Sequence, residues 1–211
     1  MPSNAHLFQC LIGIQCQDFS IVAADQMNTQ SVLVLKNDEQ KLIPIADNIL
    51  MGVNGEMGDI VQFTQFVEKN VQLYKMRNMY GLDTAATVHF TRTNLMEYLK
   101  SGNPYIINML IAGFDPGLGG QLYTMDFMAA SVRVPFATHG FGGILCMGIL
   151  DRFYKPTLSE PEAYEVIKTC ISEIQQRLFL NLPNFQVKVV SKDGIKELPK
   201  ITPATFIGTR A

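Results

Sequence analysis

ILMGVNGEMGDIVQFTQFVEKNVQLY, residues 49–74, changes its spacing of apolar residues part-way along. Residues 49–53 form a short apolar run of the kind that makes a buried strand. From Glu56 to about Arg77, apolar residues recur instead every three or four positions, as they do along one face of a helix. These residues are Ile60, Phe63, Val67, Val71 and Tyr74. The stretch therefore predicts a strand followed by a long helix.

The residues before position 49 have the pattern of a sheet. Short apolar or β-branched runs cover 7–15, 20–24 and 32–36, and polar or turn-forming residues separate them. We expect each of these runs to be a strand, so that a sheet comes first in the chain.

After the long helix, the chain is predicted to form a second helix and then to return to strands. Asp83 is suited to cap that helix, and Gly102 ends it. Residues 105–113 are apolar on both alternating faces, which indicates a central strand buried on both sides. The Asp115-Pro116-Gly117 turn leads into a further strand over 121–126.

The last part of the sequence predicts two more helices and a hairpin. A third helix covers 143–153, and the capping box Ser159-Glu160-Pro161-Glu162 begins a fourth. Residues 185–190 and a strand that starts at Ile195 form the hairpin, joined by a tight turn that contains Asp193-Gly194.

The order of these elements predicts the fold class. Strands, two helices, strands, two helices and strands indicate an α/β (α+β) protein in which two mainly antiparallel sheets pack together and helices cover both outer faces. We expect a four-layer αββα sandwich that forms a single domain over residues 1–211, with an N-terminal extension at 1–8 and a C-terminal tail at 199–211.

Composition excludes several classes of function. The 211 residues are 47% hydrophobic and 17% charged, and this sparsely charged surface suggests that partner proteins cover part of it. The formal net charge of -2 and the absence of a Lys/Arg run argue against nucleic-acid binding. The first residues lack a signal-peptide pattern, and the longest apolar run, 144–150, is too short to cross a membrane. We therefore expect a cytosolic or nuclear protein.

The cysteines and histidines predict no metal, no cofactor and no disulfide framework. The four cysteines lie scattered in apolar segments without C-x-x-C spacing, which is typical of buried free thiols. The three histidines are isolated from one another in the sequence and lack the spacing of metal ligands.

Asp25 and Lys41 are the first candidates for chemistry. Asp25 ends a predicted strand, and Lys41 follows a polar turn sixteen positions later. Such a pair at sheet ends can help to activate a nearby hydroxyl. On spacing alone, a structural ion pair or two solvated charges are the favoured interpretation.

Several motifs resemble proteasome β subunits, which are N-terminal-nucleophile hydrolases. They are IVAAD at 21–25, Lys41, MGVNG at 51–55, GFGG at 140–143 and DRFY at 151–154, in the order of the family and near its spacing. Further similar stretches are 71–78, 135–140, 149–152 and 180–183. The resemblance runs from about Cys10 to Val190 and implies the N-terminal-nucleophile hydrolase fold.

The resemblance also implies where a catalytic site would lie. In catalytic relatives an N-terminal threonine hydroxyl attacks the peptide carbonyl, its own amine and a lysine move the proton, and a glycine N–H stabilises the oxyanion. Asp25, Lys41 and Gly55 match the family's aspartate, lysine and oxyanion-hole glycine. Counting back from Asp25 places Gln9 at the position of the nucleophile, and an amide cannot attack.

Three further catalytic-site positions of the family differ here. Its glycine-serine-glycine serine falls at Phe141, its later aspartate near Leu178 and the companion serine near Asn181. The resemblance therefore implies a non-catalytic structural subunit of the 20S core particle, which helps to enclose the chamber for ATP- and ubiquitin-dependent protein degradation. The implied partners are neighbouring β subunits, the α ring and the opposed β ring, with protein substrates only within the shared chamber.

Two alternatives remain open at this stage. Cleavage after Gln9 would expose Cys10 as the nucleophile of an active hydrolase, although strand alternation points Cys10 away from the Gln9 face. A free binding module outside any ring is the other alternative. A separate apolar cluster, Tyr74, Met76, Met79 and Tyr80, is either a contact with a neighbouring subunit or a small satellite core.

Overall fold

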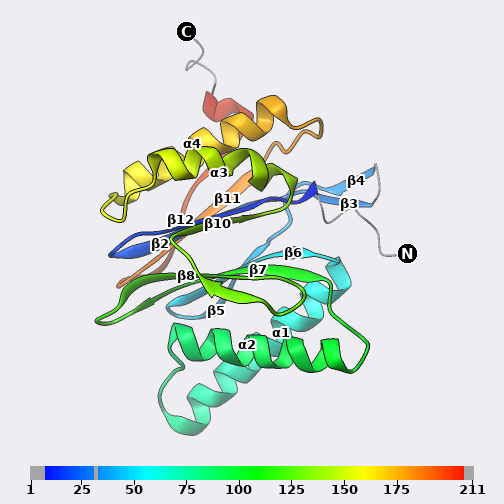
Figure 1. Cartoon of the computed structure of the whole chain (residues 1–211), viewed down its shortest axis with the longest axis vertical. Coiled ribbons are helices and arrows are strands. Elements are labelled where there is room, and N and C mark those ends of the chain that lie inside the picture. Colours follow the sequence, from blue (N-terminus) through cyan, green and yellow to red (C-terminus); the bar gives the residue numbers. More distant parts are fainter. Residues whose placement is uncertain (1–7, 31–32, 207–211) are drawn as a thin grey trace.

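Two five-stranded antiparallel sheets face each other in the computed structural model, which describes residues 8–30 and 33–206 (Figure 1). The first sheet has the order β10-β1-β2-β11-β12 and the second has the order β5-β6-β7-β8-β9. The first sheet consists of β1 (Leu11–Gln15), β2 (Phe19–Asp25), β10 (Phe136–His139), β11 (Phe185–Ser191) and β12 (Gly194–Ile201). The second consists of β5 (Leu42–Ala46), β6 (Ile49–Gly55), β7 (Ile107–Asp115), β8 (Gly119–Met125) and β9 (Ser131–Arg133).

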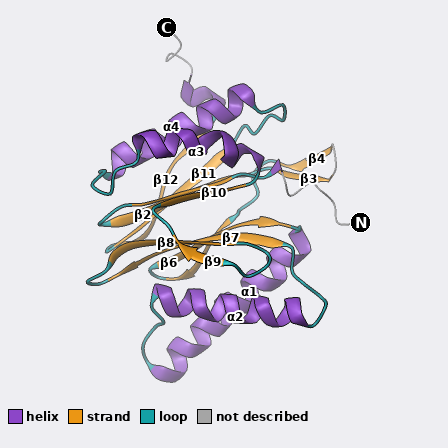
Figure 2. Cartoon of the chain, viewed as in Figure 1, coloured by secondary structure: helices purple, strands orange, loops and turns teal. Residues whose placement is uncertain are grey.

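Helices cover both outer faces of this pair of sheets (Figure 2). The helices α1 (Met57–Asn78) and α2 (Thr84–Lys100) pack on the second sheet, and α3 (Phe141–Phe153) and α4 (Glu160–Arg177) pack on the first. A short hairpin of β3 (Asn28–Gln30) and β4 (Leu33–Lys36) projects from one end, and a 3₁₀ helix, Pro203–Phe206, follows β12. The predicted α+β sandwich of four layers is confirmed.

Three apolar layers hold the sandwich together because each sheet buries both faces. One layer lies between α3, α4 and the first sheet, and one lies between α1, α2 and the second sheet. The third lies between the sheets, and its central side chains are Leu11, Val22, Leu50, Leu110 and Leu122. β6 is buried along its whole length, as expected for a strand covered on both faces.

Short strands account for most differences from the sequence-based prediction. β9 and β10 have three and four residues, too few to show an alternating pattern. β5 contains Pro44, which is tolerated because β5 lies at the edge of its sheet. The first strand begins at Leu11, so the prediction of a strand from residue 7 was wrong for its described part.

The ends of the chain also differ in part from expectation. The predicted tail at 199–211 starts inside β12, which continues to the buried Ile201 because that residue pairs with Phe185. Residues 207–211 of that tail and residues 1–7 of the predicted extension lie outside the described part of the chain. No helix among the described residues is long and apolar enough to cross a membrane.

Candidate functional site

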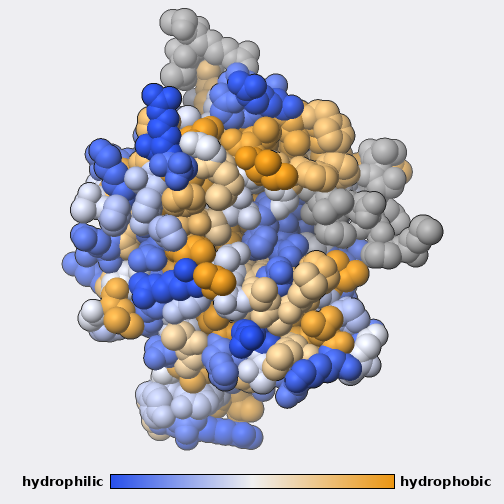
Figure 3. Space-filling view, in the orientation of Figure 1, coloured by the Kyte–Doolittle hydropathy of each residue, from blue (hydrophilic) through white to orange (hydrophobic). Residues whose placement is uncertain are grey.

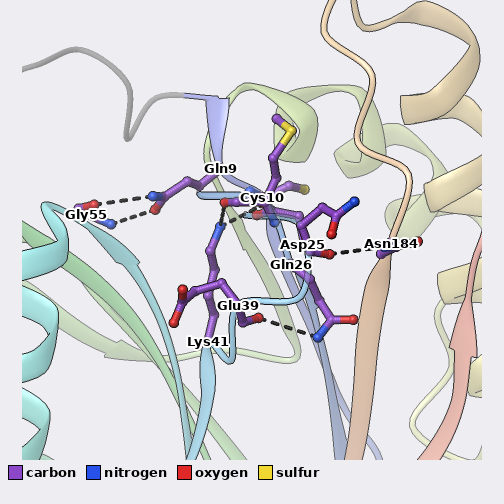
Figure 4. Close-up of polar contacts among 10 residues, drawn as sticks. Gln9, Cys10, Asp25, Gln26, Glu39, Lys41, Gly55 and Asn184 are labelled. Carbon is purple, nitrogen blue, oxygen red and sulfur yellow. Dashed lines mark hydrogen bonds and ion pairs between the residues drawn. The ribbon is translucent and has the colours of Figure 1, made fainter. Parts of the chain in front are cut away.

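Asp25, the last residue of β2, is the centre of a buried hydrogen-bond network (Figure 4). Its Oδ1 accepts from the backbone N–H of Cys10 at 2.7 Å. Its Oδ2 accepts from the backbone N–H of Met27 at 3.0 Å and from Nζ of Lys41 at 2.7 Å. Three donors therefore satisfy a carboxylate that is only 1% exposed.

Lys41 immediately precedes β5, and its side chain forms an ion pair with Asp25. Its Nζ also donates to the carbonyl oxygen of Met27 at 2.7 Å, and its side chain is 1% exposed. Burying an ion pair costs several kcal/mol of desolvation for each ion unless further hydrogen bonds compensate. Here both charged groups have additional partners on the backbone, so the pair is stable as a unit and sensitive to the loss of either member.

Gly55, the last residue of β6, provides the second part of the site. Its φ of 149° lies in a region that L-residues with a side chain rarely adopt, and a Cβ there would collide with the carbonyl oxygen of Ile106. The backbone conformation at this point therefore requires glycine.

The side chain of Gln9 forms two hydrogen bonds to Gly55. Its Oε1 accepts from the N–H of Gly55 at 2.8 Å, and its Nε2 donates to the carbonyl oxygen of Gly55 at 3.3 Å. Figure 4 shows the Gln9 amide pointing toward Gly55. The backbone of the next residue, Cys10, lies beside Asp25. The Gln9 amide oxygen thus accepts the hydrogen bond of the Gly55 N–H, a donor that would otherwise be available to an oxyanion.

Cys10 lies on the other face of the chain from Gln9, as strand alternation predicts. Its side chain is fully buried in the layer beneath α3 and α4. A Cβ added to Gly142 would lie 2.9 Å from its Sγ, so the thiol is pressed against the start of α3. Burial, and to a smaller extent the carboxylate of Asp25, raise the pKa of the Cys10 thiol well above its usual value.

Three further positions, Phe141, Leu178 and Asn181, are predicted from the sequence to differ from the family's catalytic residues. Phe141 begins α3, and its ring centroid is 5.7 Å from that of Phe8. Leu178 is the C-cap residue that follows α4 and packs on the apolar layer beneath that helix, and Asn181 is exposed in the loop before β11. None of these side chains forms a described hydrogen bond to Asp25 or Lys41.

Met27 is the residue of the network that the sequence did not indicate. Its backbone N–H donates to Asp25 and its carbonyl accepts from Lys41, so both contributions come from the main chain. No side-chain pattern could reveal this role. Among the described residues, no group of three or more His, Cys, Asp or Glu is arranged to hold a metal ion.

Comparison with known proteins decides the family. The family model described as "Proteasome subunit" matches residues 9–190, most of the chain. The chain belongs to the proteasome subunit family. This confirms the resemblance that the motifs predicted, and the matched range agrees closely with the predicted span from Cys10 to Val190.

Three curated relatives of this proteasome subunit are named as β-type subunits. The chain is 42% identical over 189 residues to "Proteasome subunit beta type-2" of Oryza sativa subsp. japonica, covering 90% of this chain and 89% of the relative. It is 41% identical to "Proteasome subunit beta type-2-B" of Arabidopsis thaliana (90% and 94% covered). It is 37% identical to "Probable proteasome subunit beta type-4" of Schizosaccharomyces pombe (90% and 98% covered). The N-terminal-nucleophile hydrolase fold follows from membership of this family.

Proposed function

We propose that this chain is a non-catalytic, structural β-type subunit of the 20S proteasome core particle. The observation that carries the proposal is the position of Gln9, whose side-chain oxygen accepts the hydrogen bond from the N–H of Gly55. The role would be to help close the β ring around the proteolytic chamber, so that catalytic neighbours degrade proteins in the ATP- and ubiquitin-dependent pathway.

Two requirements of N-terminal-nucleophile chemistry are unmet at this position. Gln9 has no hydroxyl or thiol to attack a carbonyl, so even cleavage of the bond to Phe8 would expose an amine without a nucleophilic side chain. The Gly55 N–H, which should stabilise a developing oxyanion, is already bonded to the Gln9 amide. Asp25 and Lys41 would then remain for stability, as a buried pair.

The partners and location are part of the same proposal. The subunit would contact neighbouring β subunits on both sides, the α ring on one face and the opposed β ring on the other, in the cytoplasm and nucleus. Support comes from the β-type relatives and from the large apolar side chains that the described surface exposes. Figure 3 shows such residues gathered in the region of α3. They include Phe141, Ile144 and Met147 of that helix, which are between 42% and 69% exposed.

The test is labelling of the intact particle with a peptide electrophile that reacts with N-terminal hydroxyl or thiol nucleophiles. Particles are purified through a tag on this chain, and the labelled peptides are identified by mass spectrometry. We expect label on catalytic neighbours, which serve as the internal positive control, and none on this chain. A failure to recover the chain in a large particle would contradict the structural role and favour a free binding module.

The alternative, an active hydrolase that uses Cys10, makes the opposite prediction. Label on Cys10 that disappears in Cys10→Ala would establish it. The burial of the thiol and its raised pKa argue against this outcome, because an inaccessible neutral thiol is a poor nucleophile.

A further inference from the structure

A hollow of about 660 Å³ opens where α3 ends and α4 begins. Hollows of roughly 300–1,000 Å³ are large enough to hold a ligand or the side chains of a partner protein. We call this feature the α3–α4 hollow. Its apolar lining residues are Phe153, Leu158, Pro161 and Val166, and its polar and charged lining residues are Arg152, Lys155, Thr157, Glu162 and Glu165.

The α3–α4 hollow lies at the end of the sandwich that is remote from the Asp25 site. α3 begins at Phe141, whose ring centroid lies 5.7 Å from that of Phe8 beside the site, and it ends at Phe153 in the wall of the hollow. Figure 1 shows the loop between α3 and α4 on the opposite side of the molecule from the β3–β4 hairpin. A subunit that turns its Asp25 site toward a shared chamber would therefore turn this hollow away from the chamber.

Hydrogen bonds within the chain order the loop that borders the hollow. The N–H of Gln17, in the turn between β1 and β2, donates to the carbonyl of Pro156 at 3.0 Å, and the N–H of Leu158 donates to the carbonyl of Lys155 at 3.2 Å. Leu158 also packs on the apolar layer beneath α3 and α4. A hollow that is already formed loses little conformational entropy when a partner binds.

Both carboxylates in the wall of the hollow already have partners within the chain. Glu162 accepts hydrogen bonds from the N–H of Ser159 at 2.9 Å and from its Oγ at 2.7 Å. These bonds, and to a smaller extent the charge of Lys155, lower the pKa of Glu162. Glu165 pairs with Lys168 at 3.0 Å. Groups of the chain itself therefore compensate the negative charge of the wall.

Arg152, in contrast, has no partner of opposite charge among the described ion pairs. Its guanidinium carbon lies 5.3 Å from the ring centroid of Phe153, a side chain that is 47% exposed. A guanidinium over an aromatic ring can still donate from its edge to a carboxylate. The charge at the hollow therefore favours a partner that carries a carboxylate next to an apolar side chain.

From these observations we infer that the α3–α4 hollow binds an acidic, apolar segment of a protein outside the core particle. An apolar side chain of that segment packs on Phe153, and a neighbouring carboxylate pairs with Arg152. The inference rests on the proposed function, because the orientation of the chain in the particle makes this end of the sandwich an outer surface.

A defined peptide tests the inference on particles purified through a tag on this chain. The probe is a fluorescein-labelled octapeptide that alternates leucine and aspartate, and a peptide electrophile first blocks the catalytic neighbours. We expect saturable binding in fluorescence anisotropy that is at least about tenfold tighter than binding of a peptide with lysine in place of aspartate. Equal binding of the two peptides would contradict the inference.

Arg152→Glu tests the ion pair, with Lys192→Glu as the matched control. Lys192 is exposed in the turn between β11 and β12 at the same end of the sandwich, and it does not line the hollow. Arg152→Glu should weaken binding of the leucine–aspartate probe at least about tenfold, because it places a like charge against the carboxylate. Lys192→Glu should bind the probe like the wild type, and equal losses in both variants would show a non-specific attraction.

Phe153→Ala tests the apolar contact, with Phe179→Ala as the matched control. Phe179 is 81% exposed and packs against Phe8 at the other end of α3, beside the Asp25 site. Phe153→Ala should weaken probe binding about tenfold, as expected for an aromatic anchor, whereas Phe179→Ala should leave it unchanged. Undiminished binding by Phe153→Ala would refute the apolar contact.

The remaining outcomes separate the inference from the proposed function. The proposed function fails if the wild-type chain is absent from the particle. The inference fails alone if the wild-type chain and Lys192→Glu assemble but Arg152→Glu does not, because Arg152 would then contact a neighbouring subunit. It also fails if inorganic phosphate displaces the probe as well as unlabelled peptide does, since the hollow would then be a simple anion site.

Discussion

The ion pair of Asp25 and Lys41 combines a high desolvation cost with complete hydrogen bonding. Each side chain is 1% exposed, and backbone groups of Cys10 and Met27 supply the additional partners. Such a pair adds little net stability compared with apolar residues of the same shape, whereas an isolated buried charge is expensive. This asymmetry explains how both residues can persist without a catalytic role.

Lys41→Met tests this explanation. Removal of the ammonium group leaves the Asp25 carboxylate buried with only its two backbone donors. We expect the free energy of unfolding, measured by urea denaturation of the purified chain, to fall by about 3–5 kcal/mol.

Lys75→Met is the matched control, because Lys75 forms an ion pair of the same length with Asp47 at the surface. That pair is 56% and 88% exposed, so its loss should change the unfolding free energy by less than about 1 kcal/mol. A Lys41→Met chain as stable as the parent would refute the structural role of the buried pair.

At the scale of elements, two of the three glycines of α3 lie in opposite environments. A Cβ at Gly143 would lie 2.6 Å from Cβ of Thr138 in β10, so this glycine allows the helix to approach the strand. Gly148 is exposed, and a Cβ there would meet nothing within 4 Å. We expect Gly143→Ala to destabilise the chain by about 1–3 kcal/mol and Gly148→Ala to stabilise it by up to about 1 kcal/mol. Thermal unfolding of the two variants distinguishes them, and equal effects would contradict this packing.

His139, at the end of β10, links the two sheets. Its Nε2 lies 3.0 Å from Oγ1 of Thr124 in β8 and 3.2 Å from the carbonyl oxygen of Met109 in β7. Burial lowers the pKa of His139, and the bond to Met109 and the charge of Asp126 oppose that shift to a smaller extent. The folded chain therefore binds the proton more weakly than the unfolded chain does.

The sign of this shift predicts a pH dependence. Stability should be complete above the unfolded histidine pKa of about 6.5 and should decrease as the pH falls below that value. His139→Gln should lose less stability than the wild type between pH 7.5 and pH 5.5 in urea titrations, where these two values are chosen to lie on either side of about 6.5. Identical losses in the two chains would show that His139 does not contribute.

The sequence predicts elements well where the pattern is long, and poorly where tertiary contacts decide. The stripe of α1 and the Asp83 cap of α2 are local signals, and both are present in the structure. In contrast, β10 is a strand because it pairs with β1, a partner far away in the chain. The exposed β4 shows the reverse case, since its apolar run predicts a strand but does not predict that all four residues face solvent.

The candidate site could be predicted only in part, and for the same reason. Family motifs predict Asp25, Lys41 and Gly55 as site residues, and the count from Asp25 predicts that Gln9 stands at the position of the nucleophile. Nothing in the sequence indicates that the Gln9 amide pairs with both backbone groups of Gly55, because that contact joins residues 46 positions apart. It depends on the approach of β6 to the start of β1, which the whole sandwich determines.

At the scale of the whole molecule, the sandwich combines a buried hydrogen-bond network around Asp25 with several exposed apolar side chains on its surface. All four cysteines lie in the layer between the first sheet and the helices α3 and α4, and the Cys10 thiol is fully buried there. The same architecture that positions a nucleophile in catalytic relatives would here serve to place surfaces for neighbouring subunits. The central claim is therefore that the chain contributes shape and not chemistry.

The most direct test is the mass of this chain in particles isolated under native conditions. If the claim is correct, the intact mass and the N-terminal peptides will show the Phe8–Gln9–Cys10 bonds unbroken in essentially all copies. A chain that begins at Cys10 in the assembled particle would contradict the claim, since only a processed form can present the free amine and nucleophile of an active subunit.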